Sequence, residues 1–447
     1  MFNLEGKKIT IIGGKRSGMA LVKLIIRRGG KAKLSENGPE KSLTDEFLSW
    51  ADKNKVALEF NGHTKEFIQD SSVIVMSPGV RLDSKPVEWA REKDIPVLGE
   101  IEFAFQFCHK PVIAVTGSNG KTTTVSLISE VLKKAGYKAV LCGNVGSPFA
   151  NYVLDLKEVD YVVVEVSSFQ MESLLTPDSP YRRENNKGDL TFVGFKPFIA
   201  VVLNFSQNHL DRHKDIDEYF EAKMKIFQNQ TIKEFAVLNE QDERLRKIAS
   251  HLKSSVKFFN QRDRHDGELT NPNYSAVMTV AEILGIKREI VLNVFKEFKG
   301  VEHRLELVRT LDGVDYINDS KATTAEAVGW ALKNMTRPTI IICGGRDKNI
   351  EFSVLKDLIR QKVKKMIVIG EAKEKLKRVF GEVISVDEAQ DMKDAIVQAQ
   401  HSAKKGDSIL LSPMCTSFDM FRDYEHRGKV FKEIVNGLVS LSTLQKV

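Results

Sequence analysis

Short apolar runs alternate along the chain with segments of helical periodicity. The runs at 112–116, 160–166 and 198–205 are strand-sized and rich in β-branched residues, and the segment from Val125 to Gly136 continues with helical spacing. Strands that alternate with helices predict α/β layers built on mainly parallel sheets.

The pattern divides the chain into three blocks, which we expect to be domains at 1–98, 99–307 and 308–447. The first and third blocks look Rossmann-like, and the second contains a glycine-rich turn between a strand and a helix. The expected strands of the first block lie in KKITIIGG, KAKLS and SVIVMSPGV, and those of the third in VDYIND, TIIICGG, KKMIVIG and DSILLSP. Lys15 interrupts the dinucleotide fingerprint of the first block, so we expect a modified anion loop there.

The turn Gly117 to Thr122, GSNGKT, has the chemistry of a phosphate-binding loop. A helix N-terminus presents unpaired N–H groups to an anion, Lys121 adds a full charge, and the Thr122 hydroxyl suits a magnesium ion. The loop is shorter than the general G-x-x-x-x-G-K-[ST] pattern, because Val115 stands where that pattern has its first glycine. The alternative is a tight turn with a solvated lysine.

Composition narrows the class of protein. The chain has 447 residues, 42% of them hydrophobic and 28% charged, as expected of a globular protein of two or three domains. No apolar run reaches membrane-spanning length, and the N-terminus does not resemble a signal peptide, so we expect a cytoplasmic protein. Four cysteines without metal-ligand spacing argue against zinc and disulfides. A net charge of +7 without a lysine-arginine block suits phosphorylated small molecules and does not indicate nucleic acid.

One acidic residue and two histidines carry candidate chemistry. Glu165 closes the run at 160–166, and a carboxylate at the carboxyl end of a parallel strand suits magnesium held to a nucleotide. The alternative is that Glu165 caps the next helix through its neighbours SSFQ. His209 and His213 are spaced by four, which suggests zinc, but they lack the H-E-x-x-H pattern, and one of them could be a loop or cap residue.

Lys223 is unusual in its predicted surroundings. In the helix EYFEAKMKIF we expect Phe220, Met224 and Phe227 to form the buried stripe, and Lys223 lies on the same side. A buried free ammonium is costly, so Lys223 either has a special role or extends its amine out of the stripe to solvent.

The motifs of the chain resemble those of a known family over nearly its whole length. TGSNGKTTT, EVSSFQME, LNFSQNHLDRH, EAKMKIF, EHRLE, INDSKATT, GGRDK and LLSPMCTSFDMFRDYEHRG occur in the order seen in the Mur ligases, which build the peptidoglycan stem peptide. With SPGV at Ser77 to Val80, the last two segments most resemble the branch of the family that adds D-glutamate to UDP-N-acetylmuramoyl-L-alanine.

The resemblance implies a UDP-substrate domain, a central ATPase domain and a C-terminal amino-acid domain, acting as a monomer on small molecules with neither nucleic acid nor membrane as partner. It implies two magnesium ions, with Thr122 and Glu165 on one and His209 serving the other, and it matches Lys223 to a lysine that carbon dioxide converts to a carbamate. Lys121, His209 and Lys223 would be the catalytic residues. The implied ATP-binding residues are Gly117, Ser118, Asn119, Gly120, Lys121, Thr122, Thr123, Asn273, Arg304 and Asp319.

The remaining implied sites bind the two substrates that are joined. The UDP-substrate residues are Arg16, Ser17, Glu36, Ser77, Pro78, Gly79 and Asn144. The D-glutamate residues are Thr323, Lys348, Ser417 and Tyr424. By local propensity alone, Thr323 and Ser417 could equally be helix caps, and Lys348 a solvated turn lysine.

The chain departs from the family pattern at several positions. Ala276 stands where a second adenine-side asparagine is usual, Tyr424 replaces phenylalanine, and Glu36 replaces aspartate. The segment from Lys257 to Thr270 is short, which could trim the central sheet. The alternatives are a sister Mur ligase, although the D-N-P-R motif of one sister is absent, a folylpolyglutamate synthetase, a P-loop ATPase without ligase activity, or a non-catalytic NAD-binding regulator.

Overall fold

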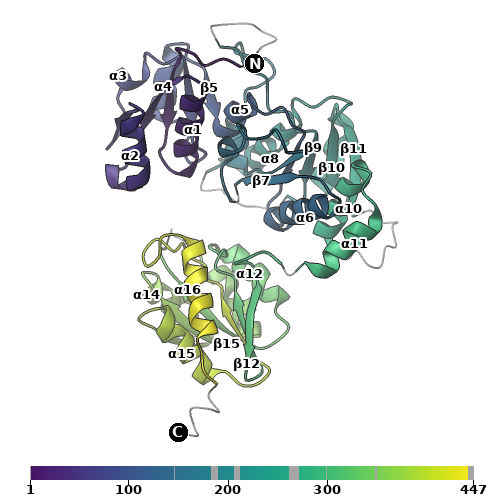
Figure 1. Ribbon diagram of the computed structural model, residues 1–447. Coiled ribbons are helices and arrows are strands. Elements are labelled where there is room, and N and C mark those ends of the chain that lie inside the picture. The colour runs from purple at the N-terminus through teal and green to yellow at the C-terminus, as the bar shows by residue number, and fades with distance from the viewer. Residues whose placement is uncertain are drawn as a thin grey trace. The chain divides into compact units, whose positions relative to one another are not determined.

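The computed structural model describes residues 2–144, 146–182, 190–205, 212–260, 271–298, 300–347 and 350–440. The chain forms two compact units, Met1–Phe298 and Lys299–Val447 (Figure 1). The first unit contains two sheets and the second contains one. Among the described helices, none has both the length and the apolar character needed to cross a bilayer.

The N-terminal sheet has five parallel strands in the order β3-β2-β1-β4-β5. Its strands are β1 (Lys8–Ile12), β2 (Lys31–Ser35), β3 (Ala57–Glu59), β4 (Val73–Met76) and β5 (Val97–Gly99). Its helices are α1 (Arg16–Arg27), α2 (Asp45–Lys53), α3 (Lys65–Ile68), α4 (Lys85–Glu92) and α5 (Glu100–Phe105), with the 3-10 turn η1 (Glu40–Ser42). The expected strands in KKITIIGG, KAKLS and SVIVMSPGV are confirmed as β1, β2 and β4.

The central sheet has six parallel strands in the order β11-β10-β9-β6-β8-β7. Its strands are β6 (Val112–Thr116), β7 (Ala139–Gly143), β8 (Tyr161–Glu165), β9 (Ile199–Val202), β10 (Phe235–Asn239) and β11 (Ser255–Phe259). Because β6 pairs in parallel with both β8 and β9, the loops that follow these three strands lie together at the carboxyl ends of the strands. The segment that looked short begins within the edge strand β11, and residues 261–270 lie outside the described part of the chain.

The helices around the central sheet position the loops described below. They are α6 (Lys121–Lys134), α7 (Ser168–Glu172), α8 (Ile216–Met224), α9 (Glu243–Ile248), α10 (Pro272–Ile283) and α11 (Arg288–Glu297), with the 3-10 turns η2 (Phe149–Asn151), η3 (Lys225–Phe227) and η4 (Ala249–His251). Asp215 starts α8 as its N-cap by accepting hydrogen bonds from the N–H groups of Asp217 and Glu218. The helix therefore begins at a residue whose side chain satisfies its first free N–H groups.

The third sheet is mixed, with the order β12-β13-β17-β14-β15-β16. Its strands are β12 (Glu306–Leu311), β13 (Val314–Asn318), β14 (Thr339–Gly344), β15 (Val363–Ile369), β16 (Ser385–Glu388) and β17 (Ser408–Leu411). Its helices are α12 (Ala325–Asn334), α13 (Lys356–Lys362), α14 (Lys373–Phe380), α15 (Met392–Ser402) and α16 (Tyr424–Asn436), with the 3-10 turn η5 (Ser353–Leu355). The four strands expected in this block are confirmed as β13, β14, β15 and β17.

The β12–β13 hairpin is the one antiparallel pair among the described strand pairings. Its turn is Asp312–Gly313, both with positive φ, and such a pair matches the twist of two adjoining antiparallel strands. The Asp-Gly pair is a recognisable hairpin signal in the sequence, but alternation alone predicted only the second of the two strands.

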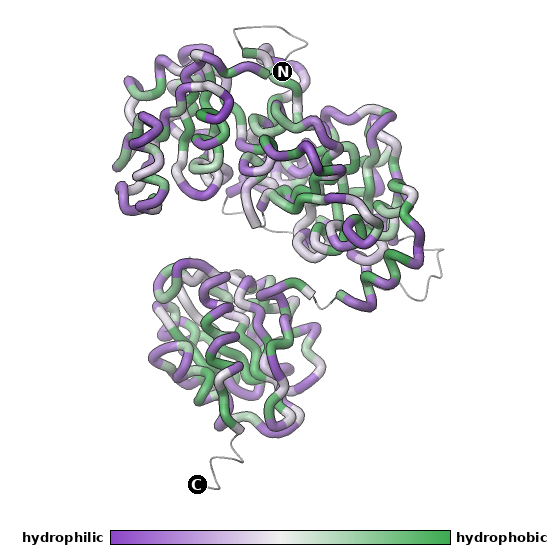
Figure 2. Tube along the Cα trace, in the orientation of Figure 1, coloured by the Kyte–Doolittle hydropathy of each residue, from purple (hydrophilic) through white to green (hydrophobic). Residues whose placement is uncertain are grey.

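The core explains why the predicted strands formed. The strands at the centre of each sheet are buried along almost their whole length, and Figure 2 shows hydrophobic residues concentrated there. Parallel strands with helices on both faces read as continuous apolar runs, as in β6, β9 and β14. The predicted α/β class with mainly parallel sheets is therefore confirmed.

Candidate active site

The glycine-rich loop lies between β6 and α6, as predicted from the sequence. Asn204, just beyond β9, binds this loop at three points. Its backbone carbonyl accepts the Ser118 N–H at 3.1 Å, its side-chain oxygen accepts the Asn119 N–H at 2.9 Å, and its amide donates to the Asn119 carbonyl at 3.1 Å. Asn204 had no assigned role from sequence, although a polar residue directly after a neighbouring parallel strand is a usable signal.

Lys121 is the first residue of α6 and its side chain turns back over the loop. Its Nζ donates to the carbonyl oxygens of Gly117 at 2.7 Å and Ser118 at 3.0 Å. The amine is therefore held beside the backbone that a phosphate would approach, and it is not simply a solvated surface lysine. Thr122, the next residue, is almost fully buried.

Lys223 is buried against the same loop, with 1% of its surface exposed. Its Nζ lies 3.2 Å from the Gly117 carbonyl oxygen, 3.5 Å from the Thr116 hydroxyl and 4.6 Å from the centre of the Tyr219 ring. Burial holds the pKa of Lys223 well below its usual range, the charge of Lys121 lowers it further, and Glu165 opposes the shift. The neutral amine is therefore favoured at this position.

The burial of Lys223 agrees with the sequence prediction, but the predicted stripe was partly wrong. Phe220 and Met224 are only half-buried, whereas Tyr219, Ala222 and Ile226 are buried. The buried residues keep regular helical spacing, so the face of α8 that packs on the core is rotated slightly from the expected one. Phe227 is buried as expected.

Glu165 ends β8 beside this loop and is 1% exposed. Its Oε1 accepts a hydrogen bond from the Asn144 amide at 2.9 Å, and its Oε2 is buried without a hydrogen-bond partner among the described residues. The backbone at Gly143 lies so close to Glu165 that a Cβ there would be 2.4 Å from the Glu165 carbonyl oxygen. Glycine also suits the φ of 103° at this position. The neighbours SSFQ do cap the next helix, through Ser167 and Gln170, but the Glu165 side chain takes no part in that cap.

These residues fit a divalent cation on chemical grounds. A buried carboxylate oxygen without a partner costs free energy, and carboxylate and hydroxyl oxygens are the ligands that magnesium prefers. Glu165 and Thr122 are the described residues that could hold such an ion, and Lys223 joins them only if its amine becomes anionic. His209 lies outside the described residues.

Asn273 lies against the glycine-rich loop at Gly120. A Cβ on Gly120, which has a φ of 83°, would lie 2.4 Å from the Asn273 side-chain oxygen. Asn271 is the N-cap of α10 and accepts the Asn273 N–H at 2.9 Å, which leaves the Asn273 side chain on the loop. Ala276 is buried one turn further on.

Arg212 joins the central part of this unit to the SPGV loop. Its guanidinium donates to the carbonyl oxygens of Gly79 at 3.2 Å and Val80 at 2.8 Å, and to the Glu172 carboxylate at 2.8 Å. The Phe169 ring packs on its face at 4.9 Å. The sequence analysis did not predict a role for this residue, because a loop arginine gives no periodic signal even when, as here, its side chain is largely buried.

His213 is buried and contacts side chains of helix α7. Its Nε2 lies 3.2 Å from the Ser168 hydroxyl and 3.4 Å from Glu172, and burial lowers its pKa. No group of three potential metal ligands surrounds it in the described part of the first unit. His213 therefore gives no support to a zinc site.

In the N-terminal part, Glu36 is committed to the backbone. Its two carboxylate oxygens accept the N–H groups of Gly14 at 2.5 Å and Gly38 at 2.8 Å. The Ser77 hydroxyl donates to the Gly13 carbonyl at 2.7 Å, which connects the SPGV loop to the glycine turn. Pro78 and Gly79 continue that loop, and Ser17 lies in the first turn of α1.

A cavity of about 360 Å³ lies between α1, α2 and the loop after β7. Arg16 and Lys23 contribute positive charge to its lining, and Ser147 and Asn151 contribute polar groups. The predicted UDP-substrate residue Arg16 therefore borders a space of ligand size, whereas Glu36 is engaged elsewhere.

In the second unit, Asp319 is buried and its Oδ2 accepts the Ser412 hydroxyl at 2.8 Å. Burial raises the pKa of Asp319 to about 7, and the hydrogen bonds from the Ser412 hydroxyl and the Leu305 N–H oppose the shift. Its Oδ1 accepts the Leu305 N–H at 3.3 Å, which links it to the loop carrying the exposed Arg304.

Of the predicted D-glutamate residues, Thr323 and Ser417 lie in loops of the second unit. The alternative that Thr323 and Ser417 are helix caps is wrong, because Thr324 caps α12 and Asp423 caps α16. Tyr424 begins α16, and the Lys321 amine lies 5.4 Å from its ring centre. Lys348 lies outside the described residues, so its position is not assigned.

Comparison with known proteins identifies the family. Three family profiles match: the Mur ligase MurD-like N-terminal domain at residues 7–99, the Mur ligase middle domain at 115–295, and the Mur ligase glutamate ligase domain at 303–415. The chain belongs to the Mur ligase family. The middle-domain match covers the glycine-rich loop, Glu165 and Lys223.

Individual Mur ligases match over almost the full length. The UDP-N-acetylmuramoylalanine--D-glutamate ligase of Koribacter versatilis is 36% identical over 464 residues, covering 97% of this chain and 98% of the relative. The protein of the same name from Salinibacter ruber is 35% identical over 473 residues, with the same coverage. The similarity therefore extends across both units.

Solved Mur ligase structures share the fold. The MurF ligase from Thermotoga maritima in complex with ADP has a TM-score of 0.58 at 16% identity, covering 91% of this chain and 95% of that one. The UDP-N-acetylmuramate-alanine ligase MurC from the same organism has a TM-score of 0.56 at 16% identity, covering 96% and 99%. At this identity the likeness concerns the fold alone.

Proposed function

We propose that the chain is an ATP-dependent, ADP-forming ligase that joins D-glutamate to UDP-N-acetylmuramoyl-L-alanine in cytoplasmic peptidoglycan precursor synthesis. The observation that carries this proposal is the similarity to D-glutamate ligases across 97% of the chain. We assign 1–98 to the UDP-substrate, 99–307 to ATP and 308–447 to D-glutamate. The protein acts as a monomer on small molecules, without nucleic acid or membrane as partner.

The proposed reaction has two steps. The L-alanine carboxylate attacks the γ-phosphorus of ATP, which releases ADP and gives an acyl phosphate. The amine of D-glutamate then attacks the acyl carbon, phosphate leaves, and the amine loses a proton. Catalysis of this kind rests on positioning and on charge neutralisation, so the amine of Lys121 and the N–H groups of its loop have the central role.

Asn204 and Asn273 keep the loop in its shape. Asn204 accepts the N–H groups of Ser118 and Asn119, which fixes the backbone of the loop and leaves the N–H groups further along it, at the start of α6, to face the phosphates. Asn273 packs on Gly120 and is proposed to reach the adenine side. Arg304 and Asp319 are the proposed ATP-side residues of the C-terminal domain.

Glu165, Thr122 and Lys223 would hold one magnesium ion, and His209 would serve a second. When bound, magnesium neutralises charge on the phosphates. Lys223 is proposed to take up carbon dioxide: its neutral amine forms a bond to the carbon, loses one proton, and becomes an anionic carbamate. Support comes from the lowered pKa of Lys223 and from the buried Oε2 of Glu165, which has no hydrogen-bond partner within the described part of the chain.

We propose that the remaining assigned residues bind the two substrates that are joined. Asn144 would orient the UDP-substrate carboxylate while it holds Glu165. The D-glutamate residues are Thr323, Lys348, Ser417 and Tyr424, and the UDP-side residues are Arg16, Ser17, Glu36, Ser77, Pro78 and Gly79.

An amino-acid panel tests the proposal. With ATP, magnesium and UDP-N-acetylmuramoyl-L-alanine supplied, phosphate release should depend on D-glutamate and be at least tenfold slower with L-glutamate, D-aspartate or meso-diaminopimelate, because a polar pocket penalises substrates that leave groups unpaired. Full phosphate release without an amino acid would indicate an ATPase. A preference for diaminopimelate with the UDP-dipeptide, or for L-glutamate with folate, would indicate a sister family.

A further inference from the structure

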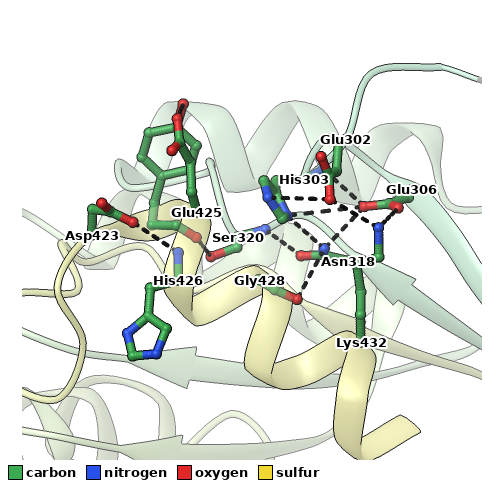
Figure 3. A network of polar contacts seen from close by, with 11 residues as sticks. Glu302, His303, Glu306, Asn318, Ser320, Asp423, Glu425, His426, Gly428 and Lys432 are labelled. Carbon is green, nitrogen blue, oxygen red and sulfur yellow. Dashed lines mark hydrogen bonds and ion pairs between the residues drawn. The ribbon is translucent and has the colours of Figure 1, made fainter. Parts of the chain in front are cut away.

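A compact polar network lies beside Arg304 in the second unit. Glu302, His303 and Glu306 place one ligand-type atom each within 4.8 Å of one another, which resembles a metal site (Figure 3). A cation is already present, however, because the Lys432 Nζ lies 3.0 Å from Glu302 Oε1 and 2.5 Å from Glu306 Oε1. The His303 Nδ1 pairs with the Asn318 amide at 2.9 Å. The network therefore holds a lysine and gives no reason to invoke a metal ion.

The network surrounds a short segment, His303 to Leu305, whose backbone conformation is rare for residues other than glycine. Arg304 lies between His303, with a φ of 65°, and Leu305, with a φ of 41°. Left-handed backbone at two non-glycine residues persists only where the surroundings impose it. Arg304 is exposed at the point of this turn.

Hydrogen bonds on both sides of Arg304 impose that shape. Glu306 Oε2 accepts the His303 N–H at 2.9 Å and the Asn318 amide at 3.0 Å. On the other side, the Leu305 N–H donates to Asp319 at 3.3 Å. The Glu306 carboxylate thus holds the turn, and its own position depends on what holds its second oxygen.

Helix α16 supplies that second contact. Gly428 and Lys432 are four residues apart and face the turn together (Figure 3). A Cβ on Gly428 would lie 2.2 Å from the His303 Nδ1, so the helix backbone approaches the imidazole closely. Lys432 then extends to both Glu302 and Glu306.

The charges match this arrangement. Burial opposes the Lys432 charge, but hydrogen bonds to Glu306 and Glu302 prevail and raise its pKa. The hydrogen bond from Lys432 lowers the pKa of Glu302. At neutral pH one ammonium lies between two carboxylates, and its removal would leave them to repel each other across the turn.

We propose that Lys432 is a positioning residue that holds the Glu302–Glu306 turn and thereby fixes the backbone conformation from which Arg304 acts. This inference rests on the proposed function, in which Arg304 is an ATP-side residue. Lys432 acts through Arg304 and does not itself touch a substrate.

The test compares Lys432→Met with Lys429→Met, an exposed lysine on the same helix. In the full-length enzyme, Lys432→Met should lower kcat/KM for ATP about tenfold, mainly through KM, while Lys429→Met stays within about twofold of wild type. Lys432→Arg should recover most of the loss because it restores the charge. In an Arg304→Ala background, adding Lys432→Met should change kcat/KM by less than about twofold, since its route of action is gone.

Hydrogen exchange gives a readout independent of turnover. The amides of His303 and Leu305 should exchange faster in Lys432→Met than in Lys429→Met, and unchanged exchange would overturn the proposal. Equal activity of the two single variants, or a full tenfold loss in the Arg304→Ala background, would also overturn it. Absence of D-glutamate-dependent phosphate release in the wild type would instead refute the proposed function, and the exchange comparison alone would then decide the role of Lys432.

Discussion

The side-chain nitrogen of Lys223 lies 3.2 Å from the carbonyl oxygen of Gly117, although 106 positions separate the two residues in the chain. Helix α8 thereby brings a buried amine beneath the phosphate-type loop. Burial and the neighbouring Lys121 favour its neutral form, which is the form that reacts with carbon dioxide.

Lys223→Ala should be nearly inactive, and short carboxylates in the buffer should partly restore turnover by replacing the missing anionic ligand. The exposed Lys233→Ala should behave as wild type. Carbon-13 NMR with labelled carbon dioxide should detect a carbamate signal in the wild type that disappears in Lys223→Ala. A fully active enzyme without that signal would refute carbamylation.

Lys121→Ala should reduce kcat by about a hundredfold to a thousandfold, because it removes one preorganised charge at the transferred phosphoryl group. The melting temperature should change little, since the Lys121 amine donates to carbonyl oxygens of the loop and does not pack in the core. Lys133→Ala, at an exposed position of the same helix, provides the matched control. Activity within about fivefold of wild type would contradict the phosphate-binding assignment.

Arg212→Ala should raise KM for the UDP-substrate about tenfold and affect KM for ATP much less, because the guanidinium holds the carbonyl oxygens of the SPGV loop. Steady-state kinetics with each substrate varied in turn measures the difference. The exposed Arg246→Ala controls for the loss of one positive charge. Equal effects on both KM values would mean that Arg212 supports the fold generally.

Glu100 should make the free energy of unfolding depend on pH. Burial raises its pKa from 4.5 to about 7, against the hydrogen bond from the Ala150 N–H. Between pH 4.5 and about 7, Glu100 keeps its proton in the folded state but has released it in the unfolded state. The free energy of unfolding therefore decreases as pH rises through this range, by about 3 kcal/mol from Glu100.

Glu100→Gln should remove that contribution. Urea unfolding at pH 5 and pH 8 should show a smaller loss of stability in this variant than in the wild type, whereas the exposed Glu130→Gln should follow the wild type. Equal pH dependence in Glu100→Gln and the wild type would show that Glu100 ionises normally.

Local signals in the sequence determined much of the site. The strand, glycine turn and helix at 112–134 followed from apolar runs and from the order Gly-Ser-Asn-Gly-Lys-Thr, because each of these depends on neighbouring residues only. The burial of Lys223 followed from helical spacing. The stripe around it was partly wrong, because Phe220 and Met224 also have helical spacing, and spacing alone does not decide which of two neighbouring faces packs on the core.

Only the tertiary structure decided which distant residues meet. The sheet order places β8 and β9 on either side of β6, and this brings Glu165 and Asn204 to the loop after β6. The same kind of long-range pairing commits Glu36 to backbone N–H groups, aims Arg212 at the SPGV loop and places Lys432 between Glu302 and Glu306. The physical reason is that strand order and helix docking are set by burial of the whole core, so these contacts follow from the packed fold and not from the periodicity of any one segment.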